Sequence, residues 1–84
     1  MRPYAVYINE AALSFAPRSG PQRKYLMEFI RLLAVNPNIP GDFSEQDGTG
    51  RTIQVKLVGR HAVTYWADHA VAEVKITHIK SADK

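Results

Sequence analysis

Apolar and polar residues alternate in three successive runs that make up most of the second half of the chain. These runs are 51–58, 62–67 and 71–79. Alternation with a period of two residues is typical of a β-strand that buries one of its faces. Gly59-Arg60 and Asp68-His69 separate the runs, and glycine, aspartate and histidine tolerate the backbone angles of tight turns. The pattern therefore predicts an antiparallel meander of three strands.

The lengths of the two turns decide which side chains of the meander share a face. A two-residue loop at Asp68-His69 places the apolar residues of the second and third runs on one face. We expect an odd-numbered loop or a bulge at Gly59-Arg60, because glycine beside a hairpin often marks a bulge. The predicted core face then holds Ile53, Val55, Leu57, Val63, Tyr65, Ala72, Val74 and Ile76. The other face would be open and mostly polar, with Gln54, Lys56, Ala62, Thr64, Trp66, Glu73, Lys75 and Thr77.

Apolar residues between positions 21 and 35 recur at the spacing of an amphipathic helix. The stripe consists of Leu26, Phe29, Ile30 and Leu33, widened by Tyr25, Met27 and Leu32. Positions i, i+3, i+4 and i+7 lie on one side of a helix, so this stripe is expected to face the core. Pro21 suits the first helical turn, and Asn36-Pro37 ends the helix because the residue before proline disfavours helical angles.

Weaker patterns complete the order of elements. We expect a short strand at 4–8, a short helix at 11–16 and a further strand at 42–46. The order is then strand, helix, helix and four strands. This order predicts an α+β fold in which a single antiparallel sheet has the two N-terminal helices packed on one face. A chain of this length is expected to form one domain, over residues 1–84.

Composition and charge narrow the classes of function. None of the apolar runs approaches the roughly 20 residues that cross a bilayer, so no membrane association is expected. The absence of cysteine excludes disulfides and thiolate chemistry, and it fits a cytoplasmic protein. Residues 1–40 hold five basic and two acidic residues, which equals the whole net charge of +3. A basic domain favours a nucleic acid or an acidic protein as its partner.

Motifs for cofactors and metals are missing from the sequence. His61, His69 and His78 do not have metal-ligand spacing, so no metal site is predicted. A glycine-rich phosphate loop and a Ser-His-Asp or Cys-His arrangement are also absent, and no small-molecule cofactor is expected.

Several stretches resemble a known group of proteins. They are the strand at 4–8, the helix at 21–35, and the segments GDFSEQDGTGR (41–51), KLVGRHAVTYWADHAV (56–71) and EVKITHIKSAD (73–83). In these stretches the chain is similar to the RelE/ParE superfamily of toxins from bacterial type II toxin–antitoxin systems. The resemblance covers almost the whole chain. It implies a small cytoplasmic toxin that a cognate antitoxin neutralises.

The resemblance implies two alternative activities. Nuclease members cleave messenger RNA (mRNA) in the ribosomal A site with basic and histidine side chains of the open sheet face, whereas ParE-like members poison DNA gyrase. Nuclease members usually carry an arginine in the second strand of the meander, where this chain has Ala62. His78 could match the C-terminal aromatic or histidine residue of nuclease members, but a terminal tyrosine is absent.

The leading interpretation is a toxin that cleaves mRNA on the ribosome. A second is a ParE-like or catalytically degenerate protein that acts by binding a protein target such as gyrase. The third is a nucleic-acid-binding β-sheet module unrelated to toxins.

Cleavage of RNA needs a base, an acid and cations that offset the developing charge on phosphate. We predict that the catalytic residues are Lys56, Arg60, His61, His78 and Lys80. In the predicted meander the far end of the third run, at 76–78, lies beside the turn that holds Arg60 and His61, so these residues are expected to converge. Glu45 is a further candidate for the base. RNA or a partner protein is predicted to contact Glu45, Arg51, Gln54, Trp66 and Lys75. Trp66 is suited to stack a base or to anchor an antitoxin segment, and the Tyr25/Leu32 flank of the helix is a second candidate anchor.

Overall fold

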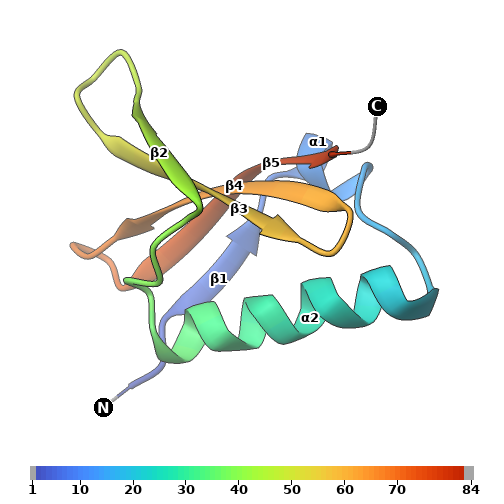
Figure 1. The fold of residues 1–84 in the computed structure, drawn as a ribbon. Helices are drawn as coiled ribbons and strands as arrows, with labels where there is room; N and C mark the ends of the chain where they lie inside the picture. Colours follow the sequence, from blue (N-terminus) through green and yellow to red (C-terminus); the bar gives the residue numbers. More distant parts are fainter. Residues whose placement is uncertain (1, 83–84) are drawn as a thin grey trace.

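The computed structural model describes residues 2–82, which form two helices and five strands (Figure 1). The strands are β1 (Ala5–Ile8), β2 (Phe43–Gln46), β3 (Thr52–Val58), β4 (His61–Asp68) and β5 (Glu73–Ser81). The helices are α1 (Glu10–Leu13) and α2 (Gly20–Val35). All seven predicted elements are present in the predicted order. α1 is shorter than expected and ends three residues before Ala16.

Local interactions fix the ends of both helices. The Asn9 side-chain oxygen accepts a hydrogen bond from the Ala11 N–H at 2.9 Å, which caps α1. α2 has proline in its first turn and ends at Asn36, whose N–H donates to the Leu32 carbonyl. Neither helix in residues 2–82 is long and apolar enough to cross a membrane.

The five strands form one sheet in the order β1-β5-β4-β3-β2. β2 to β5 pair antiparallel, as predicted, and β1 pairs parallel to β5. The α+β class with a single sheet is confirmed, and the sheet is mixed rather than wholly antiparallel. Parallel neighbours need a crossover connection instead of a hairpin, and residues 9–72, which include both helices, provide it.

The turn between β3 and β4 is tighter than expected. Val58 pairs with His61, so the loop contains only Gly59 and Arg60, with Gly59 at φ +60°. The expectation of an odd-numbered loop was wrong, because a glycine with positive φ closes a two-residue turn without a bulge.

This tight turn reverses the predicted faces of β3. Lys56 pairs with Val63 and Gln54 pairs with Tyr65, so both polar residues lie on the helix side of the sheet. The apolar residues of β3 lie on the open face instead: Ile53, Val55 and Leu57. The open face is therefore less polar than the sequence suggested.

The connection between β4 and β5 is longer than expected. Asp68 pairs with Glu73, so the loop spans residues 69–72 instead of two residues, and Ala72 adopts φ +55°. The register shifts by four positions relative to the predicted one, and an even shift keeps the same residues on the core face. Val63, Tyr65, Val74 and Ile76 are buried as predicted, whereas Ala72 lies in the loop.

A bulge in β5 changes the faces of its last residues. Tyr65 pairs with Ile76 but Thr64 pairs with His78, which leaves Thr77 as the extra residue. Ile79 therefore points into the core, where it is 1% exposed, and His78 lies on the open face.

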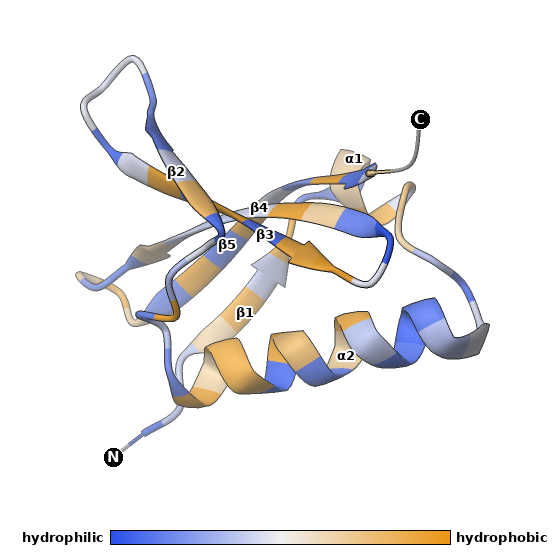
Figure 2. Cartoon of the chain, in the orientation of Figure 1, coloured by the Kyte–Doolittle hydropathy of each residue, from blue (hydrophilic) through white to orange (hydrophobic). Residues whose placement is uncertain are grey.

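The core lies between the sheet and the two helices. α2 extends across one face of the sheet, and apolar residues recur along it and along the central strands (Figures 1 and 2). The buried cluster consists of Ala12, Leu26, Phe29, Leu33, Val58, Val63, Tyr65, Val74, Ile76 and Ile79. Phe29 and Tyr65 meet edge to face with their ring centroids 5.4 Å apart. Both helices contribute to this one cluster, so they pack on the same face as predicted.

Tyr65 is the only residue of this cluster with a polar side chain. Its hydroxyl donates a hydrogen bond of 2.7 Å to the Ile39 carbonyl, which joins the sheet to the connector after α2. Burial, with a smaller contribution from the Asp42 charge, raises the pKa of Tyr65 to about 12.

We expect Tyr65→Phe to lower the free energy of unfolding by about 1 kcal/mol, because the Ile39 carbonyl loses its donor. Tyr25→Phe, at an exposed position, is the matched control and should change little. Urea unfolding measures both. A raised pKa means that the neutral phenol stabilises the fold below the ordinary value of about 10. That stabilisation should be lost as pH rises toward about 12. Equal effects of the two variants would contradict the role of this hydrogen bond.

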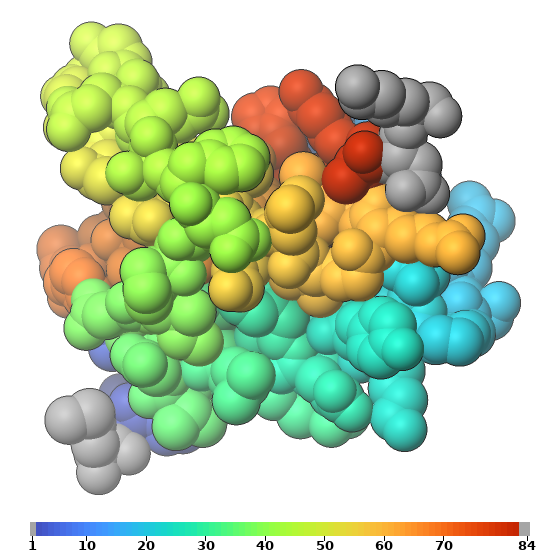
Figure 3. Space-filling model, viewed as in Figure 1, coloured from blue at the N-terminus to red at the C-terminus, as the bar shows by residue number. Residues whose placement is uncertain are grey.

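The β2–β3 hairpin projects from the body of the molecule (Figures 1 and 3). All residues of β2 are exposed, and the strand is held where it begins by Asp42. One Asp42 carboxylate oxygen accepts the Leu57 N–H at 2.7 Å, and the other lies 3.6 Å from the Lys56 ammonium. The hydrogen bond from Leu57, followed by the Lys56 charge, lowers the pKa of Asp42, so the carboxylate stays ionised at neutral pH.

Candidate functional site

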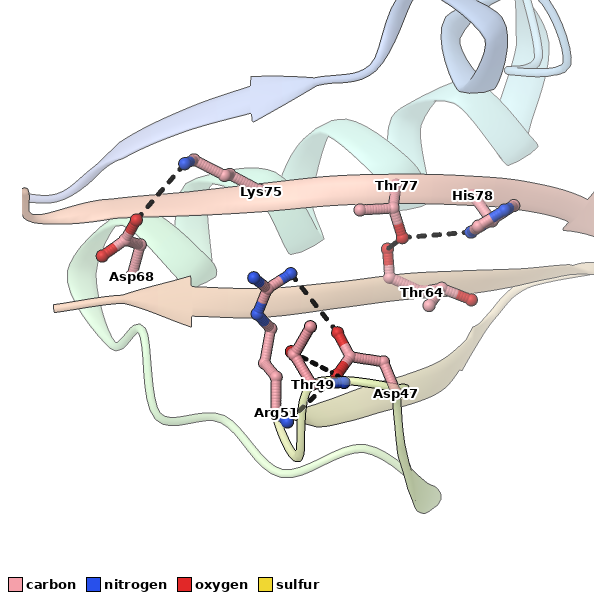
Figure 4. Close-up of polar contacts among 8 residues, drawn as sticks. All are labelled: Asp47, Thr49, Arg51, Thr64, Asp68, Lys75, Thr77 and His78. Atoms are coloured by element: carbon pink, nitrogen blue, oxygen red, sulfur yellow. Dashed lines mark hydrogen bonds and ion pairs between the residues drawn. The ribbon is translucent and has the colours of Figure 1, made fainter.

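The face of the sheet opposite the helices carries the candidate site. Among residues 2–82 no helix covers it, since α1 and α2 both bury their apolar residues in the cluster on the other side. Figure 4 shows polar side chains of this open face and of the turn that precedes β3: Asp47, Thr49, Arg51, Thr64, Asp68, Lys75, Thr77 and His78. They form two groups along β4 and β5, one beside Trp66 and Lys75 and the other beside Thr64 and His78.

The first group is a cationic and aromatic cluster, formed by Arg51, Trp66 and Lys75. The Arg51 guanidinium carbon lies 3.8 Å from the centre of the Trp66 ring. The Lys75 ammonium lies 5.0 Å from the same centre, because Trp66 and Lys75 are paired residues of β4 and β5. Cations at these distances are attracted to the negative face of an indole ring.

The turn before β3 positions Arg51. The Asp47 carboxylate accepts hydrogen bonds from the Thr49 hydroxyl at 2.7 Å, the Thr49 N–H at 2.9 Å and the Arg51 N–H at 3.0 Å. Its second oxygen lies 3.4 Å from the Arg51 guanidinium. The two bonds from Thr49, followed by those from Arg51, lower the pKa of Asp47, so the carboxylate that orients Arg51 is ionised at neutral pH.

We expect the fluorescence of Trp66, the single tryptophan of the chain, to report this arrangement. Arg51→Ala should shift the emission to longer wavelength and increase quenching by iodide, because water replaces the guanidinium over the ring. Acid should cause a similar shift with a midpoint below pH 3.8, since stabilisation by a carboxylate of lowered pKa is lost only as pH falls through that pKa. Arg18→Ala, outside the cluster, is the control, and an unchanged spectrum in Arg51→Ala would contradict the contact.

The cluster continues toward β1. The Lys75 ammonium lies 3.3 Å from the Asp68 carboxylate and 3.9 Å from that of Glu73 (Figure 4). On its other side Lys75 is the register partner of Tyr7, whose side chain is 55% exposed. A hollow of about 230 Å³ lies here, lined by Tyr7, Trp66, Lys75 and Thr77 among others. Two aromatic rings and a cation thus border one shallow cavity.

The second group surrounds His78. The Thr77 hydroxyl lies 3.5 Å from the Thr64 carbonyl oxygen and 3.0 Å from the His78 Nδ1 (Figure 4). Which partner donates in the contact between Thr77 and His78 depends on the histidine tautomer. In the tautomer with its proton on Nδ1, the ring donates to the Thr77 hydroxyl, and the lone pair of Nε2 lies on an exposed side chain.

The bulge and the register bring Lys80 to the same face as His78. Lys80 pairs with Ala62 and His78 pairs with Thr64, so the two side chains are neighbours on one face at a spacing of about 7 Å along the strand. Trp66 is two residues from Thr64 on β4, which gives a similar distance to the cationic and aromatic cluster. A single extended nucleotide chain could contact both groups.

The structure separates the other residues predicted to be catalytic. Lys56 and His61 lie on the helix side of the sheet, where the His61 Nδ1 is buried without a hydrogen-bond partner among the described residues. Arg60 lies in the β3–β4 turn, where its N–H donates to the Gln22 side chain at 2.7 Å and its carbonyl accepts from Ala82 at 2.8 Å.

The expected proximity of Arg60 to His78 is therefore not found. Ala82, the residue after β5, lies beside the turn instead, because the longer β4–β5 loop and the bulge shift the register. His78 is paired with Thr64, which is four residues, or about 13 Å, along the chain from Arg60. Of the predicted catalytic set, His78 and Lys80 share the open face and Arg60 borders it.

The predicted binding residues also divide. Arg51, Trp66 and Lys75 form the cluster described above. Glu45 pairs with Ile53 on the open face of the projecting hairpin, whereas Gln54 lies on the helix side and accepts the Gly41 N–H at 2.9 Å. The Tyr25/Leu32 flank of α2 is exposed, at 46% and 58%, and does not belong to the open face, because α2 packs on the other side of the sheet.

Among the polar and aromatic contributors to the site, Tyr7, Asp47, Thr64, Asp68 and Thr77 were not predicted as site residues. The alternation in 4–8 does place Tyr7 opposite Val6 and Ile8, but no sequence pattern specifies that β1 pairs with β5. The part of the chain that the structure describes holds no group of three metal-ligating side chains.

Comparisons with known proteins relate this arrangement to one fold. Searches with protein-family models and against curated proteins find no match to the chain. A search of solved structures matches the crystal structure of the archaeal RelE–RelB complex from Pyrococcus horikoshii OT3, with a TM-score of 0.77 and 16% sequence identity. The match covers 98% of this chain and 98% of that chain. The chain therefore has a RelE-like fold over nearly its entire length.

Proposed function

We propose that the protein is the toxin of a type II toxin–antitoxin pair and that it inhibits growth by cleaving mRNA on the ribosome. The observation that supports it is the RelE-like fold across 98% of the chain, combined with an open sheet face that presents His78, Lys80 and Trp66. The partners in this proposal are a cognate antitoxin, the ribosome and mRNA, all encountered in the cytoplasm.

The open face offers the groups that cleavage of RNA requires. The Nε2 of His78 takes the proton of a ribose 2′-hydroxyl, and the 2′-oxygen then attacks the adjacent phosphorus. The bond to the 5′-oxygen breaks, that oxygen takes a proton from solvent, and a cyclic phosphate remains. Lys80 offsets the charge that develops on the phosphate oxygens. The Trp66 ring, which lies near the Arg51 and Lys75 cations, offers an aromatic surface on which a base of the bound strand stacks.

The ribosome has a defined part in this proposal. A site with one imidazole, and with Ala62 at the position of the usual strand arginine, is a weak catalyst on free RNA. Binding in the decoding site would hold the reacting atoms in line, and such positioning can supply much of the rate enhancement.

Controlled expression in a bacterium, with and without the neighbouring gene, tests the function. We expect growth arrest together with new mRNA 5′ ends at a fixed position within codons, and we expect co-expression of an antitoxin gene to restore growth. Arrest without new mRNA ends would exclude the nuclease activity but retain a toxin. Normal growth at high expression would contradict both.

Trp66→Ala should weaken binding of single-stranded RNA about tenfold, because a stacked base contributes roughly 1–3 kcal/mol. Fluorescence anisotropy of a labelled oligonucleotide measures the affinity. Leu32→Ala removes an exposed apolar side chain from α2 and should leave the affinity unchanged. Equal affinities for the two variants would remove Trp66 from the RNA-binding surface.

A second function is supported by the apolar end of the open face. Phe43 and Leu57 are 55% and 49% exposed and lie on this face at the β2–β3 hairpin. Arg51 and Lys75 are also engaged by Asp47 and Asp68, which lowers their attraction for phosphate. A ParE-like toxin that binds a protein such as gyrase would use these apolar residues. Leu57→Ser would then relieve toxicity, whereas it should leave mRNA cleavage unchanged if the nuclease proposal holds.

A further inference from the structure

A groove of about 530 Å³ lies outside the open face, between α1 and the last part of β5. Figure 1 shows α1 beside the C-terminal end of this strand. Apolar side chains line much of the groove, among them Ala12, Phe15 and Ile79. Phe15 is 68% exposed, which is high for a large aromatic side chain next to further apolar surface.

The same groove runs along an edge of the sheet. The register between β1 and β5 ends at Ile8 and Ile76, and β5 continues beyond it through residues 77–80. Within residues 2–82, no strand pairs with this part of β5 on the side away from β4. A strand edge of this kind is a template for an added strand from another chain.

The charges along the groove indicate which kind of peptide segment it would bind. His78 and Lys80 contribute to its lining, and none of the lining residues within positions 2–82 is acidic. Lys80 lies on the open-face side of β5, whereas Ile79 points to the helix side. Successive residues of an added strand alternate between these two sides. Apolar residues would therefore face α1, and the acidic residues between them would face Lys80.

We propose that this groove binds an extended segment of a partner protein, in which apolar and acidic residues alternate, as an added strand on β5. The segment would lie along β5 beyond Ile76, where the pairing with β1 has ended. Its source in the cell is the antitoxin, and this assignment rests on the proposed function. The binding itself does not depend on whether the protein cleaves RNA.

The test uses the full chain and a short synthetic peptide in which glutamate and valine alternate. A matched peptide has lysine in place of each glutamate. Amide chemical shifts and hydrogen exchange are followed as each peptide is added. We expect the acidic peptide to bind about tenfold more tightly than the basic one, as for one strong charge contact. We expect shifts confined to α1 and β5, with slower exchange of the Ile79 amide.

Two exposed variants complete the test without threatening the fold. Lys80→Glu should abolish the preference for the acidic peptide, and Phe15→Ser should weaken binding of both peptides. Leu32→Ser, exposed on α2, should change neither. Equal affinities of the two peptides, or shifts centred on β2 or on Arg51 and Trp66, would overturn the proposal. Neither of those results would alter the expression test, so failure of this site is distinguishable from failure of the proposed function.

Discussion

Leu33→Ala should lower the free energy of unfolding by about 3 kcal/mol, because removing a fully buried leucine loses its transfer energy and leaves a cavity. Leu33 is 0% exposed and packs in the cluster between α2 and the sheet. In a domain of 84 residues this is a large share of a total stability that ordinarily amounts to 5–15 kcal/mol, or about 0.1 kcal/mol per residue. Urea unfolding followed by circular dichroism measures it.

The neighbouring residue provides the control for this prediction. Leu32 precedes Leu33 in α2 and is 58% exposed, so Leu32→Ala should change stability by less than about 0.5 kcal/mol. Both variants have the same helix propensity change, and only burial differs. Similar losses in the two variants would show that the packing of α2 on the sheet is wrong.

The positions of helices and strands were predictable, because the buried face of each element fixes the spacing at which apolar residues recur in the sequence. The stripe of Leu26, Phe29 and Leu33 faces the core as a period of 3.6 residues requires, and Val74 and Ile76 are buried while Glu73 and Lys75 between them are not. Leu32, which was expected to widen the stripe, is exposed because a helix on one face of a sheet buries only a narrow side.

Turn geometry could not be predicted from the same pattern. Gly59 was compatible with a bulge or with a tight turn, and the tight turn reversed the faces of β3. Ala72 adopts a positive φ that alanine rarely adopts, so nothing in the sequence indicated a loop of four residues. The bulge at Thr77 is set by long-range pairing with β4 and has no local signal.

These turns also explain why the candidate site was only partly predictable. Arg51, Trp66 and Lys75 were chosen as binding residues by their side-chain chemistry, and the register gathers them. The predicted catalytic set depended on the β3–β4 turn lying beside residues 76–78. The observed register does not place them together, and it puts His61 and Lys56 on the helix side of the sheet. Residue type identified chemistry, whereas register decided which groups meet.

His78→Ala should reduce the rate of mRNA cleavage about a hundredfold, because the variant loses the base that activates the 2′-hydroxyl. The contribution of a positioned acid–base group is typically 10²–10⁴-fold, so about a hundredfold is the lower end of the expectation. His78 is exposed and its contact with Thr77 lies outside the core, so the variant should unfold at the same urea concentration as the unchanged protein. Mapping mRNA 5′ ends during induced expression measures the loss.

Two further variants locate the reacting centre. His69→Ala removes an exposed histidine whose Nδ1 lies 2.8 Å from the Tyr4 hydroxyl in the β4–β5 loop, away from His78, and it should leave cleavage unchanged. Arg60→Ala should reduce cleavage less than His78→Ala, because the row of Arg60 lies about 13 Å from that of His78 and Lys80 stands between them. A larger loss in Arg60→Ala would move the reacting phosphate to the β3–β4 turn. Full cleavage by His78→Ala would exclude the open face as the nuclease site and favour a toxin that acts through Phe43 and Leu57 on a protein target.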